Sequence, residues 1–152
     1  MMSVQESSVA EVTGAPNFAD LAIEYAGESA IDGLPPPAAK MATYRHLEAV
    51  GMLHVFSAIN DGELVGFITV LAPVLPHYGV PVAVSESFFV ARAHRKTGAG
   101  LRLLRLAEQK ARALGSPGLL VSAPFEGDLC RVLPHVGYRE TNRVFFRRTS
   151  DA

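Results

Sequence analysis

The stretch from Phe88 to Leu104 constrains the fold of this chain more than any other part of the sequence. An apolar run over 88–90 is followed by basic residues, by glycines at positions 98 and 100, and then by an amphipathic segment. This order predicts a strand, a turn and a helix. Helix N-termini leave about four backbone N–H groups without partners and carry partial positive charge, so the turn would attract an anion. Because glycine lets a ligand approach the backbone closely, we expect a phosphate or pyrophosphate there.

The size and charge of the chain limit its class. A length of 152 residues predicts a single domain over 1–152 that buries about two thirds of its unfolded surface. The formal net charge of −1 argues against a protein that binds nucleic acid. Cys130 is the only cysteine, which excludes an intrachain disulfide. No apolar stretch approaches the roughly 20 residues of a membrane span, and no secretory signal is evident, so we expect a cytoplasmic protein without a membrane partner.

The remaining patterns mix helical and strand periodicity and predict an α+β fold. Residues 1–12 are weakly patterned, and they form either an edge strand or a poorly ordered terminus. Asn60-Asp61-Gly62 is typical of a hairpin turn. The expected elements are helices over 17–28 and 37–50, strands over 52–58 and 64–71, a loop over 72–81, a strand over 82–90, a helix over 98–114, a strand over 119–122, a short helix over 128–133 and a last strand over 143–148.

The turn sequence Arg95-Lys96-Thr97-Gly98-Ala99-Gly100 fits the pattern Arg/Gln-x-x-Gly-x-Gly/Ala. Between an apolar strand and a long helix, it resembles the signature of the GNAT family of acyl-CoA-dependent N-acetyltransferases. The resemblance extends to the turn Gly137-Tyr138 and covers about 18–148. It implies a GNAT-like, three-layer α/β fold whose mixed, mostly antiparallel sheet is flanked by helices. The alternative is that both glycines only permit a tight turn between strand and helix.

Other phosphate-binding motifs do not fit this turn. The dinucleotide-binding fingerprint needs a third glycine, which is absent after Gly100. The nucleoside-triphosphate pattern Gly-x-x-x-x-Gly-Lys-Ser/Thr does not occur in the chain. The resemblance therefore implies that acetyl-CoA, as a co-substrate, supplies the pyrophosphate.

The resemblance also implies how coenzyme A would lie. Its pyrophosphate would rest on the backbone N–H groups of the turn, and its pantetheine arm would pair with the strand over 88–90 like an extra strand. A backbone N–H of Phe89 or Val90 would stabilise the oxyanion. The side chains of Arg95 and Lys96 are either phosphate contacts or solvated loop charges. The expected coenzyme A contacts are Phe88, Phe89, Val90, Arg95, Lys96, Thr97, Gly98, Ala99, Gly100 and Leu101.

Glu86 is the candidate general base, because many GNAT members keep an acidic residue at this place. An alkylamine has a pKa near about 10.4 and must lose a proton before it attacks. Strand alternation places Glu86 on one face with Phe88 and Val90, where apolar neighbours would desolvate the carboxylate. Alternatively, Glu86 points outward or pairs with an arginine.

The general acid is not assigned by the resemblance. GNAT members often have a tyrosine four residues before the glycine of the Gly-Tyr turn, where this sequence has Leu133. A thiolate leaving group, whose thiol has a pKa near about 8.5, needs little protonation during the reaction. Ser122, Cys130 and Tyr138 are alternatives, although each fits a structural role as well.

The acceptor site has weaker signals. His77 and Tyr78, before the cofactor strand, either line the acceptor pocket or belong to an ordinary exposed loop. The five histidines lack the spacing of metal ligands, so no metal is expected. A homodimer, through an edge strand or the Phe88 side, is also compatible with the resemblance.

The resemblance predicts an N-acetyltransferase that moves an acetyl group from acetyl-CoA to a primary amine. The amine, on a small molecule or a peptide, would attack directly in a ternary complex. A catalytically degenerate acyl-CoA-binding protein is the alternative, which the missing tyrosine favours slightly. A nucleotide- or nucleic-acid-binding module using the basic residues of 92–96 is a third interpretation, which the near-neutral net charge disfavours.

Overall fold

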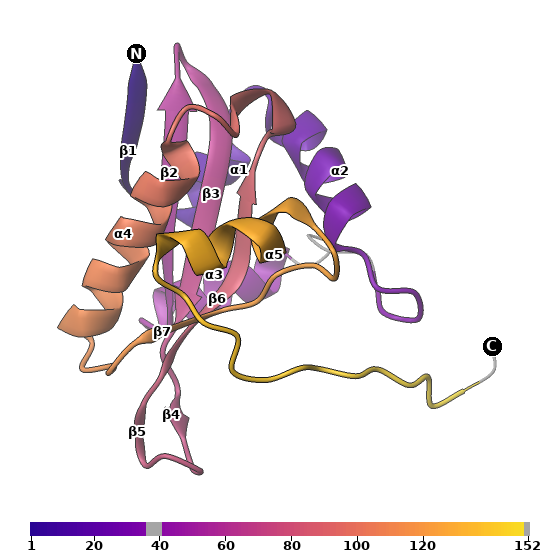
Figure 1. Ribbon diagram of the computed structural model, residues 1–152. Helices are drawn as coiled ribbons and strands as arrows, with labels where there is room; N and C mark the ends of the chain where they lie inside the picture. Colours follow the sequence, from indigo (N-terminus) through magenta and orange to yellow (C-terminus); the bar gives the residue numbers. More distant parts are fainter. Residues whose placement is uncertain (36–40, 151–152) are drawn as a thin grey trace.

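The centre of the fold is a mixed sheet, described by a computed structural model for residues 1–35 and 41–150 (Figure 1). Its strands are β1 (Met2–Ser7), β2 (Leu53–Asn60), β3 (Glu63–Leu71), β6 (Ala83–Val90) and β7 (Leu119–Val121), in the spatial order β1-β2-β3-β6-β7. The first four are antiparallel to their neighbours, and β7 is parallel to β6. This is the mixed, mostly antiparallel sheet that the sequence predicts.

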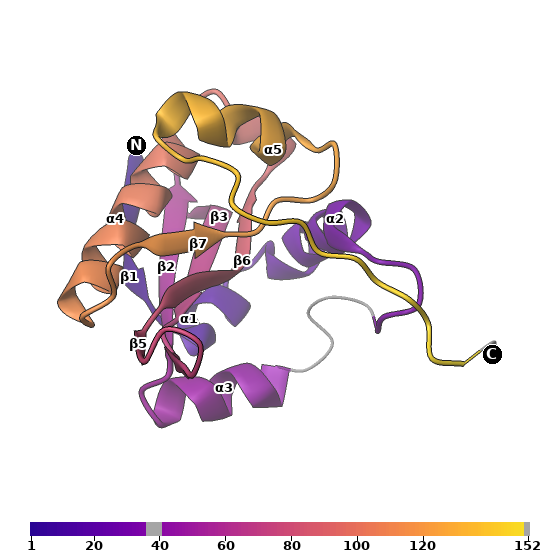
Figure 2. The same cartoon turned by 60° about the horizontal axis from the view of Figure 1, so that its bottom comes forward.

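Helices cover both faces of this sheet, which gives three layers (Figures 1 and 2). They are α1 (Val9–Thr13), α2 (Phe18–Ser29), α3 (Met41–Ala49), α4 (Ala99–Ala113) and α5 (Asp128–Val132), with the 3-10 turns η1 (Arg92–His94) and η2 (Leu133–Val136). α4 buries Leu103, Leu104 and Ala107 against one face. α1 and α2 bury Val9 and Leu21 against the other, and the partly buried side of α3 packs there too. The α+β prediction is confirmed.

The long helix predicted over 98–114 is α4. Gly98 precedes it with φ 84° and Gly115 follows it with φ 85°, both in the left-handed region that favours glycine. Leu103 occupies the buried side, whereas Leu101 is exposed. Leu101 therefore lies on the solvent side of the first helical turn.

Only the first part of β6 pairs with β7. Ala83–Ser85 of β6 pair with Leu119–Val121, and β7 ends there. Residues 87–90 of β6 pair with β3 on one side and have no strand partner on the other within the described chain. The sheet therefore opens along the second half of β6, directly before the glycine turn.

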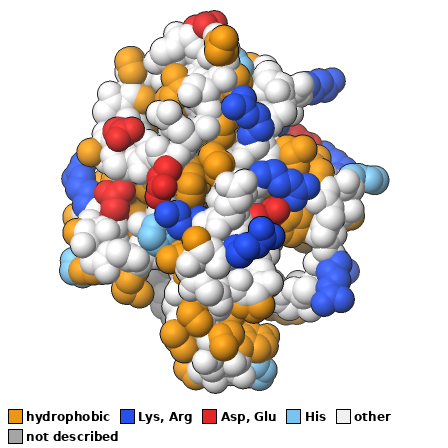
Figure 3. Space-filling view, turned by 90° about the vertical axis from the view of Figure 1, so that its left-hand side faces the viewer, with side chains coloured by type: hydrophobic (Ala, Val, Ile, Leu, Met, Phe, Trp, Pro, Cys, Tyr) orange, Lys and Arg blue, Asp and Glu red, His pale blue; other side chains and the backbone are white. Residues whose placement is uncertain are grey.

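The proline-rich loop predicted over 72–81 contains a small hairpin of β4 (Val74–Leu75) and β5 (Val80–Pro81). Figure 3 shows apolar side chains gathered on this projection at the bottom of the molecule. Tyr78 lies near its tip with 62% of its surface exposed. The hairpin thus extends away from the two packed faces of the sheet.

The two ends of the chain differ in whether they pair with the sheet. Residues 2–7 form β1 along the full edge of β2, so the edge-strand alternative describes the N-terminus. The last strand predicted over 143–148 is wrong, because these residues are extended but pair with no strand in the described part. The predicted beginning of the second helix, at 37, lies outside the described residues, and α3 begins at Met41. No helix within the described chain is long and apolar enough to cross a membrane.

Candidate functional site: a glycine turn and an acceptor pocket along one strand

The turn before α4 presents a set of backbone N–H groups. Those of Ala99, Gly100 and Leu101 belong to the first helical turn, where N–H groups have no partner within the helix. A side chain added at Gly100 would make only ordinary contacts, 3.5 Å to Val90 Cγ2 and 3.7 Å to Phe88 Cζ. Packing within the chain therefore leaves room for a Cβ at this position. No contact within the described chain therefore requires glycine at position 100.

Two N–H groups of the predicted anion site donate to backbone carbonyls within the turn, and a third, that of Ala99, donates to Thr97 Oγ1 at 3.4 Å. The N–H of Arg95 donates to the Arg92 carbonyl at 3.4 Å, and the N–H of Thr97 donates to the His94 carbonyl at 3.3 Å. The N–H groups of the other predicted contacts in the turn either donate to no backbone carbonyl within the described chain or lie in the first turn of α4. These contacts are Lys96, Gly98, Ala99, Gly100 and Leu101.

The side chain of Arg95 is held in a network of ion pairs, so it is not a solvated loop charge, and its expected contact with phosphate stays a prediction. Its guanidinium donates to Glu28 at 2.7 Å, to Asp128 at 2.9 Å and to the Val90 carbonyl at 2.9 Å. Partial burial lowers the pKa of Arg95, but hydrogen bonds and the charges of both carboxylates raise it overall. Arg95 thus joins α2, β6 and the start of α5, while Lys96 lies outside this network.

The open edge of β6 presents alternate backbone groups. The N–H of Ala91 donates to the Val65 carbonyl of β3 at 2.8 Å. Because backbone groups alternate in direction along a strand, those of Phe89 face β3 while those of Phe88 and Val90 face the open side. The Val90 carbonyl indeed accepts from the Arg95 side chain there. Of the two oxyanion donors considered from the sequence, Val90 is therefore the one that faces the opening.

Glu86 lies in an irregularity of the sheet. Ser85 pairs with Val70 and Ser87 pairs with Thr69, so Glu86 is an extra residue between consecutive pairs. The expected alternation, with Glu86 on the face of Phe88 and Val90, is wrong because this bulge turns its side chain to the opposite face. Glu86 is also exposed, so the expected desolvation among apolar neighbours is wrong.

The carboxylate of Glu86 is held by two hydroxyl groups. Tyr44 Oη on α3 donates to its two oxygens at 2.9 and 2.8 Å, and Thr69 Oγ1 on β3 donates at 3.1 Å. Burial and the charge of Glu86 raise the pKa of Tyr44, so its hydroxyl stays protonated as a donor. The sequence places Tyr44 on the apolar stripe of its helix but gives no signal that it reaches Glu86.

A cavity of about 50 Å³ lies beside this cluster, between the sheet and the three N-terminal helices. Tyr25 packs edge-to-face on Phe67 and Phe89 at one end, with ring centroids 5.4 and 5.6 Å apart. Burial, followed by the charge of Glu86, raises the pKa of Tyr25. The cavity is lined by Val9, Val12, Thr13, Phe18, Ala22, Tyr25, Met41, Tyr44, Val55, Phe67, Thr69 and Ser87.

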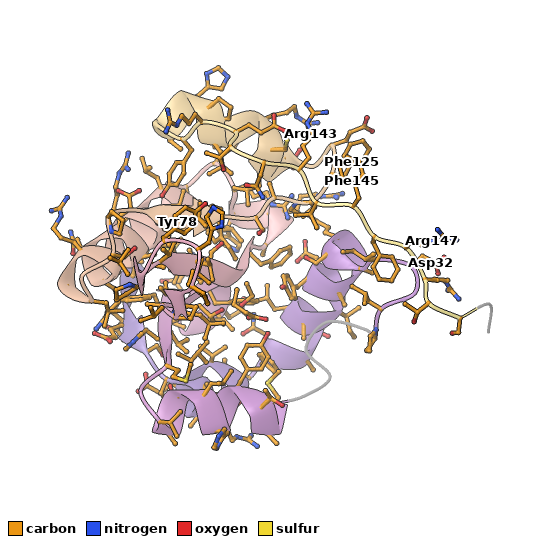
Figure 4. All side chains as sticks on the ribbon, turned by 90° about the horizontal axis from the view of Figure 1, so that it is seen from below. Asp32, Tyr78, Phe125, Arg143, Phe145 and Arg147 are labelled. Atoms are coloured by element: carbon orange, nitrogen blue, oxygen red, sulfur yellow. The ribbon has the colours of Figure 1, made fainter. Side chains whose placement is uncertain are left out.

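The predicted acceptor contacts His77 and Tyr78 are not among the residues that line this cavity. Their rings pack edge-to-face, with centroids 4.8 Å apart, on the projecting hairpin. Figure 4 shows Tyr78 on that hairpin, viewed from below. Their expected contact with the acceptor stays a prediction.

The candidate general acids are all placed by the structure. Leu133 is buried in the core under α4, where it offers no proton. Tyr138 Oη donates to Glu108 at 2.7 Å, and burial together with that bond raises the pKa of Tyr138. Ser122 and Cys130 are exposed. Ser85, which the sequence did not single out, has a buried hydroxyl without a hydrogen-bond partner in the described chain, at the point where β6 and β7 separate.

The sequence of this chain matches the model of a known protein family. The family, described as Acetyltransferase (GNAT), matches residues 20–125, which include β6, Glu86 and the glycine turn. The chain belongs to the GNAT acetyltransferase family. A comparison with curated protein sequences finds no match. Members of this family are acyltransferases.

Solved GNAT structures share the fold over nearly the whole chain. Ribosomal-protein-alanine N-acetyltransferase from Brucella melitensis biovar Abortus 2308 has 19% identity and a TM-score of 0.72, with 97% of this chain and 99% of that chain covered. AAC(6')-Iy, in complex with the bisubstrate analogue CoA-S-monomethyl-acetylneamine, has 21% identity and a TM-score of 0.75, with 99% of both chains covered. A predicted acetyltransferase with acetyl-CoA from Clostridium acetobutylicum has 11% identity and a TM-score of 0.74, with 97% and 96% covered.

This GNAT chain shows no metal centre in its described part. Residues 1–35 and 41–150 contain no group of three or more His, Cys, Asp and Glu side chains that could hold a metal ion. The described site offers the backbone N–H groups of the turn, the carboxylate of Glu86 and its hydroxyl partners.

Proposed function

We propose that this protein transfers an acetyl group from acetyl-CoA to a primary amine by direct attack in a ternary complex. The observation that carries the proposal is that β6 joins two complementary features. Its end leads into a turn of N–H groups with room above Gly100, and its bulge turns Glu86 to the other face of the sheet, where its partners Tyr44 and Thr69 line a cavity. Solved GNAT neighbours that hold acetyl-CoA or a coenzyme A bisubstrate analogue support the same donor here.

The donor would bind along the open side of β6. The pyrophosphate would accept hydrogen bonds from the N–H groups of Gly98, Gly100 and Leu101, and Lys96 would add a positive charge. The pantetheine amides would pair with the outward backbone groups of Phe88, because the Val90 carbonyl already accepts from the Arg95 side chain. In that pose the Val90 N–H is the donor nearest to the developing oxyanion.

The acceptor would approach from the cavity side. Glu86 takes a proton from the ammonium form of the amine, directly or through a water molecule, while Tyr44 and Thr69 hold the carboxylate in place. The amine nitrogen then attacks the thioester carbon and the carbon–sulfur bond breaks. The second nitrogen proton is lost and the thiolate takes up a proton from solvent, which yields the N-acetylated amine and coenzyme A.

The lining of the cavity favours an amine attached to an apolar group. Most of its lining side chains are aliphatic or aromatic. The nearby carboxylate of Glu28 is paired with Arg92 and Arg95, and Glu24 accepts from the Arg92 N–H. Glu86, whose hydroxyl partners Tyr44 and Thr69 line the cavity, is the carboxylate that would attract an ammonium group there. A monoamine with an aromatic or alkyl body fits this arrangement better than a polycationic aminoglycoside.

Thiol release from acetyl-CoA over a panel of amines tests the proposal. We expect phenylethylamine and hexylamine to be acetylated faster than neamine, and Glu86→Gln to lower kcat by about 10²- to 10⁴-fold, as for a lost general base. Glu63→Gln, an exposed carboxylate at the start of β3, is the matched control. An unchanged rate in Glu86→Gln would remove Glu86 from the mechanism.

The degenerate alternative rests on a specific observation. The place of the usual acid holds the buried Leu133, and the hydroxyl of Tyr138 is already bonded to Glu108. This alternative predicts tight coenzyme A binding without turnover of any amine. Salt-dependent oligonucleotide binding that coenzyme A does not displace would instead favour the nucleic-acid interpretation.

A further inference from the structure

A second cavity, of about 190 Å³, lies beside β1, the strand at the edge of the sheet (Figure 1). It is bounded by β1, by α1, by the connection from α1 to α2 and by the hairpin of β2 and β3, and it is called the β1 cavity below. Among the described residues, Val12 alone lines both this cavity and the acceptor cavity. The β1 cavity is therefore distinct from the proposed acetyl-transfer site.

Strand alternation turns polar side chains of β1 toward this cavity. Met2 and Val4 pack against the core on the α4 side of the sheet, whereas Gln5 and Ser7 line the cavity on the opposite face. A sheet face that packs against helices ordinarily carries apolar side chains. The polar side chains here therefore fit a ligand that can form hydrogen bonds.

Ser57 on β2 forms the buried floor of the β1 cavity. It is paired with Gln5 across the strands and is only 3% exposed. Within the described chain its hydroxyl has no hydrogen-bond partner. Buried hydroxyl groups in proteins nearly always bond to another protein group, to ordered water or to a ligand. The partner of Ser57 must therefore enter through the cavity.

Glu11 on α1 gives the β1 cavity a negative charge. No lysine, arginine or histidine is among the described residues that line the cavity, and Glu11 is the one acidic residue there. Glu11 is exposed, and Ser7 Oγ donates to its Oε2 at 3.1 Å. Because a carboxylate accepts about four hydrogen bonds, it can still bind a cation. The charge of the cavity thus favours a ligand with an ammonium group.

The wall between these two polar positions is apolar and fixed in place. Val12 and Leu64, which are both buried, contribute to it. The side-chain amide of Asn17 accepts from the Leu64 N–H at 3.0 Å and donates to the Leu64 carbonyl at 2.8 Å, which ties the start of α2 to β3. A ligand that spans the cavity would therefore contact this wall with methylene groups.

We propose that the β1 cavity binds a short amino alcohol, whose ammonium group pairs with Glu11 and whose hydroxyl bonds to Ser57. The charge-assisted bond to Glu11 selects a cation. The buried hydroxyl of Ser57 selects a ligand with a second polar group, because an alkylamine would leave Ser57 without a partner. At roughly 30 Å³ for each water-sized group, a volume of about 190 Å³ holds about six non-hydrogen atoms, the size of 4-aminobutan-1-ol.

Titration of the isotope-labelled full chain, followed by nuclear magnetic resonance, tests the proposal without acetyl-CoA. The probes are ethanolamine, 3-aminopropan-1-ol and 4-aminobutan-1-ol, and the controls butylamine and butan-1-ol each lack one polar group. We expect the backbone signals of Ser57 and Gly14 to shift and saturate with at least one amino alcohol. Its dissociation constant at these signals should be at least about fivefold lower than that of either control. No saturation, equal binding of a control, or shifts confined to residues around Glu86 would overturn the proposal.

Two variants test the assigned contacts. Ser57→Ala removes a hydroxyl that bonds to nothing in the described chain, and Glu11→Gln removes an exposed charge, so each should weaken binding of the best amino alcohol at least about fivefold. Ser85→Ala, a buried serine outside the cavity, is the control for the first. Glu6→Gln, on the other face of β1 where Glu6 pairs with Lys110 at 3.0 Å, is the control for the second. Circular dichroism checks that all four variants are folded. Unchanged affinity in either test variant, or an equal loss in its control, contradicts the proposed site.

Discussion

Gly100→Ala is expected to move stability and coenzyme A affinity in opposite directions. The added Cβ would make ordinary contacts at 3.5 Å and 3.7 Å, and Gly100 is not among the glycines with positive φ. Replacing a helical glycine by alanine at such a site stabilises a protein by about 0.4–1 kcal/mol. We therefore expect the variant to be slightly more stable toward denaturant.

The same methyl group would stand where the pyrophosphate approaches the first turn of α4. Losing one hydrogen bond to a charged group costs about 1.5–3 kcal/mol. That corresponds to a dissociation constant for coenzyme A raised by about 10- to 100-fold. Calorimetric titration with coenzyme A and urea unfolding measure the two quantities on the same protein.

Two other glycines serve as matched controls. Gly27 lies inside α2 with nothing near a Cβ, so Gly27→Ala should gain stability and keep its affinity. Gly98 has φ 84° with open space around it, so Gly98→Ala should lose about 1–2 kcal/mol from backbone strain alone. If Gly100→Ala binds coenzyme A as tightly as the parent chain, the anion does not lie on this turn. If the Gly100→Ala variant unfolds, the role of Gly100 is only to allow the backbone conformation of the turn.

Three further variants test the neighbouring contacts. Arg95→Ala should lose roughly 1.5–3 kcal/mol of stability in urea unfolding, because hydrogen bonds to two carboxylates are removed, yet change coenzyme A affinity less than threefold; a tenfold loss would place the guanidinium on the phosphate. Tyr44→Phe should lower kcat for amines by about tenfold at unchanged coenzyme A affinity, and an unchanged kcat would show that Glu86 needs no such support. Because the pKa of Tyr138 is raised in the folded state, its contribution is complete below the unfolded value of about 10 and is lost as pH rises above it. Unfolding between pH 9 and 12 should therefore show a smaller alkaline loss of stability in Tyr138→Phe than in the parent chain, and equal losses would contradict the assigned pKa shift.

Local pattern was sufficient for much of the fold. The apolar periodicity of 98–114 and its flanking glycines predicted α4 closely, because both signals act within a few residues of chain. The hairpin between β2 and β3 followed from Asn60-Asp61-Gly62 for the same reason. The strand predicted over 143–148 failed because its residues have strand propensity but no partner strand within the described chain.

The site itself depended on contacts that sequence spacing does not report. Alternation predicted the wrong face for Glu86, since one bulge against Val70 and Thr69 shifts every side chain on one side of it. Arg95 was expected to contact a phosphate or to be a solvated loop charge, whereas its guanidinium pairs with Glu28, which lies 67 positions earlier in the chain.

The sequence by itself therefore determined the order of elements, the glycine turn and the family that this turn resembles. These depend on short-range periodicity and on the backbone freedom of particular residues. Only the tertiary structure decided which way Glu86 faces, that Tyr44 holds it, and that residues 143–148 form no strand of the sheet within the described chain. Each of these features depends on whether segments far apart along the chain come into contact. Strand register and packing determine those contacts.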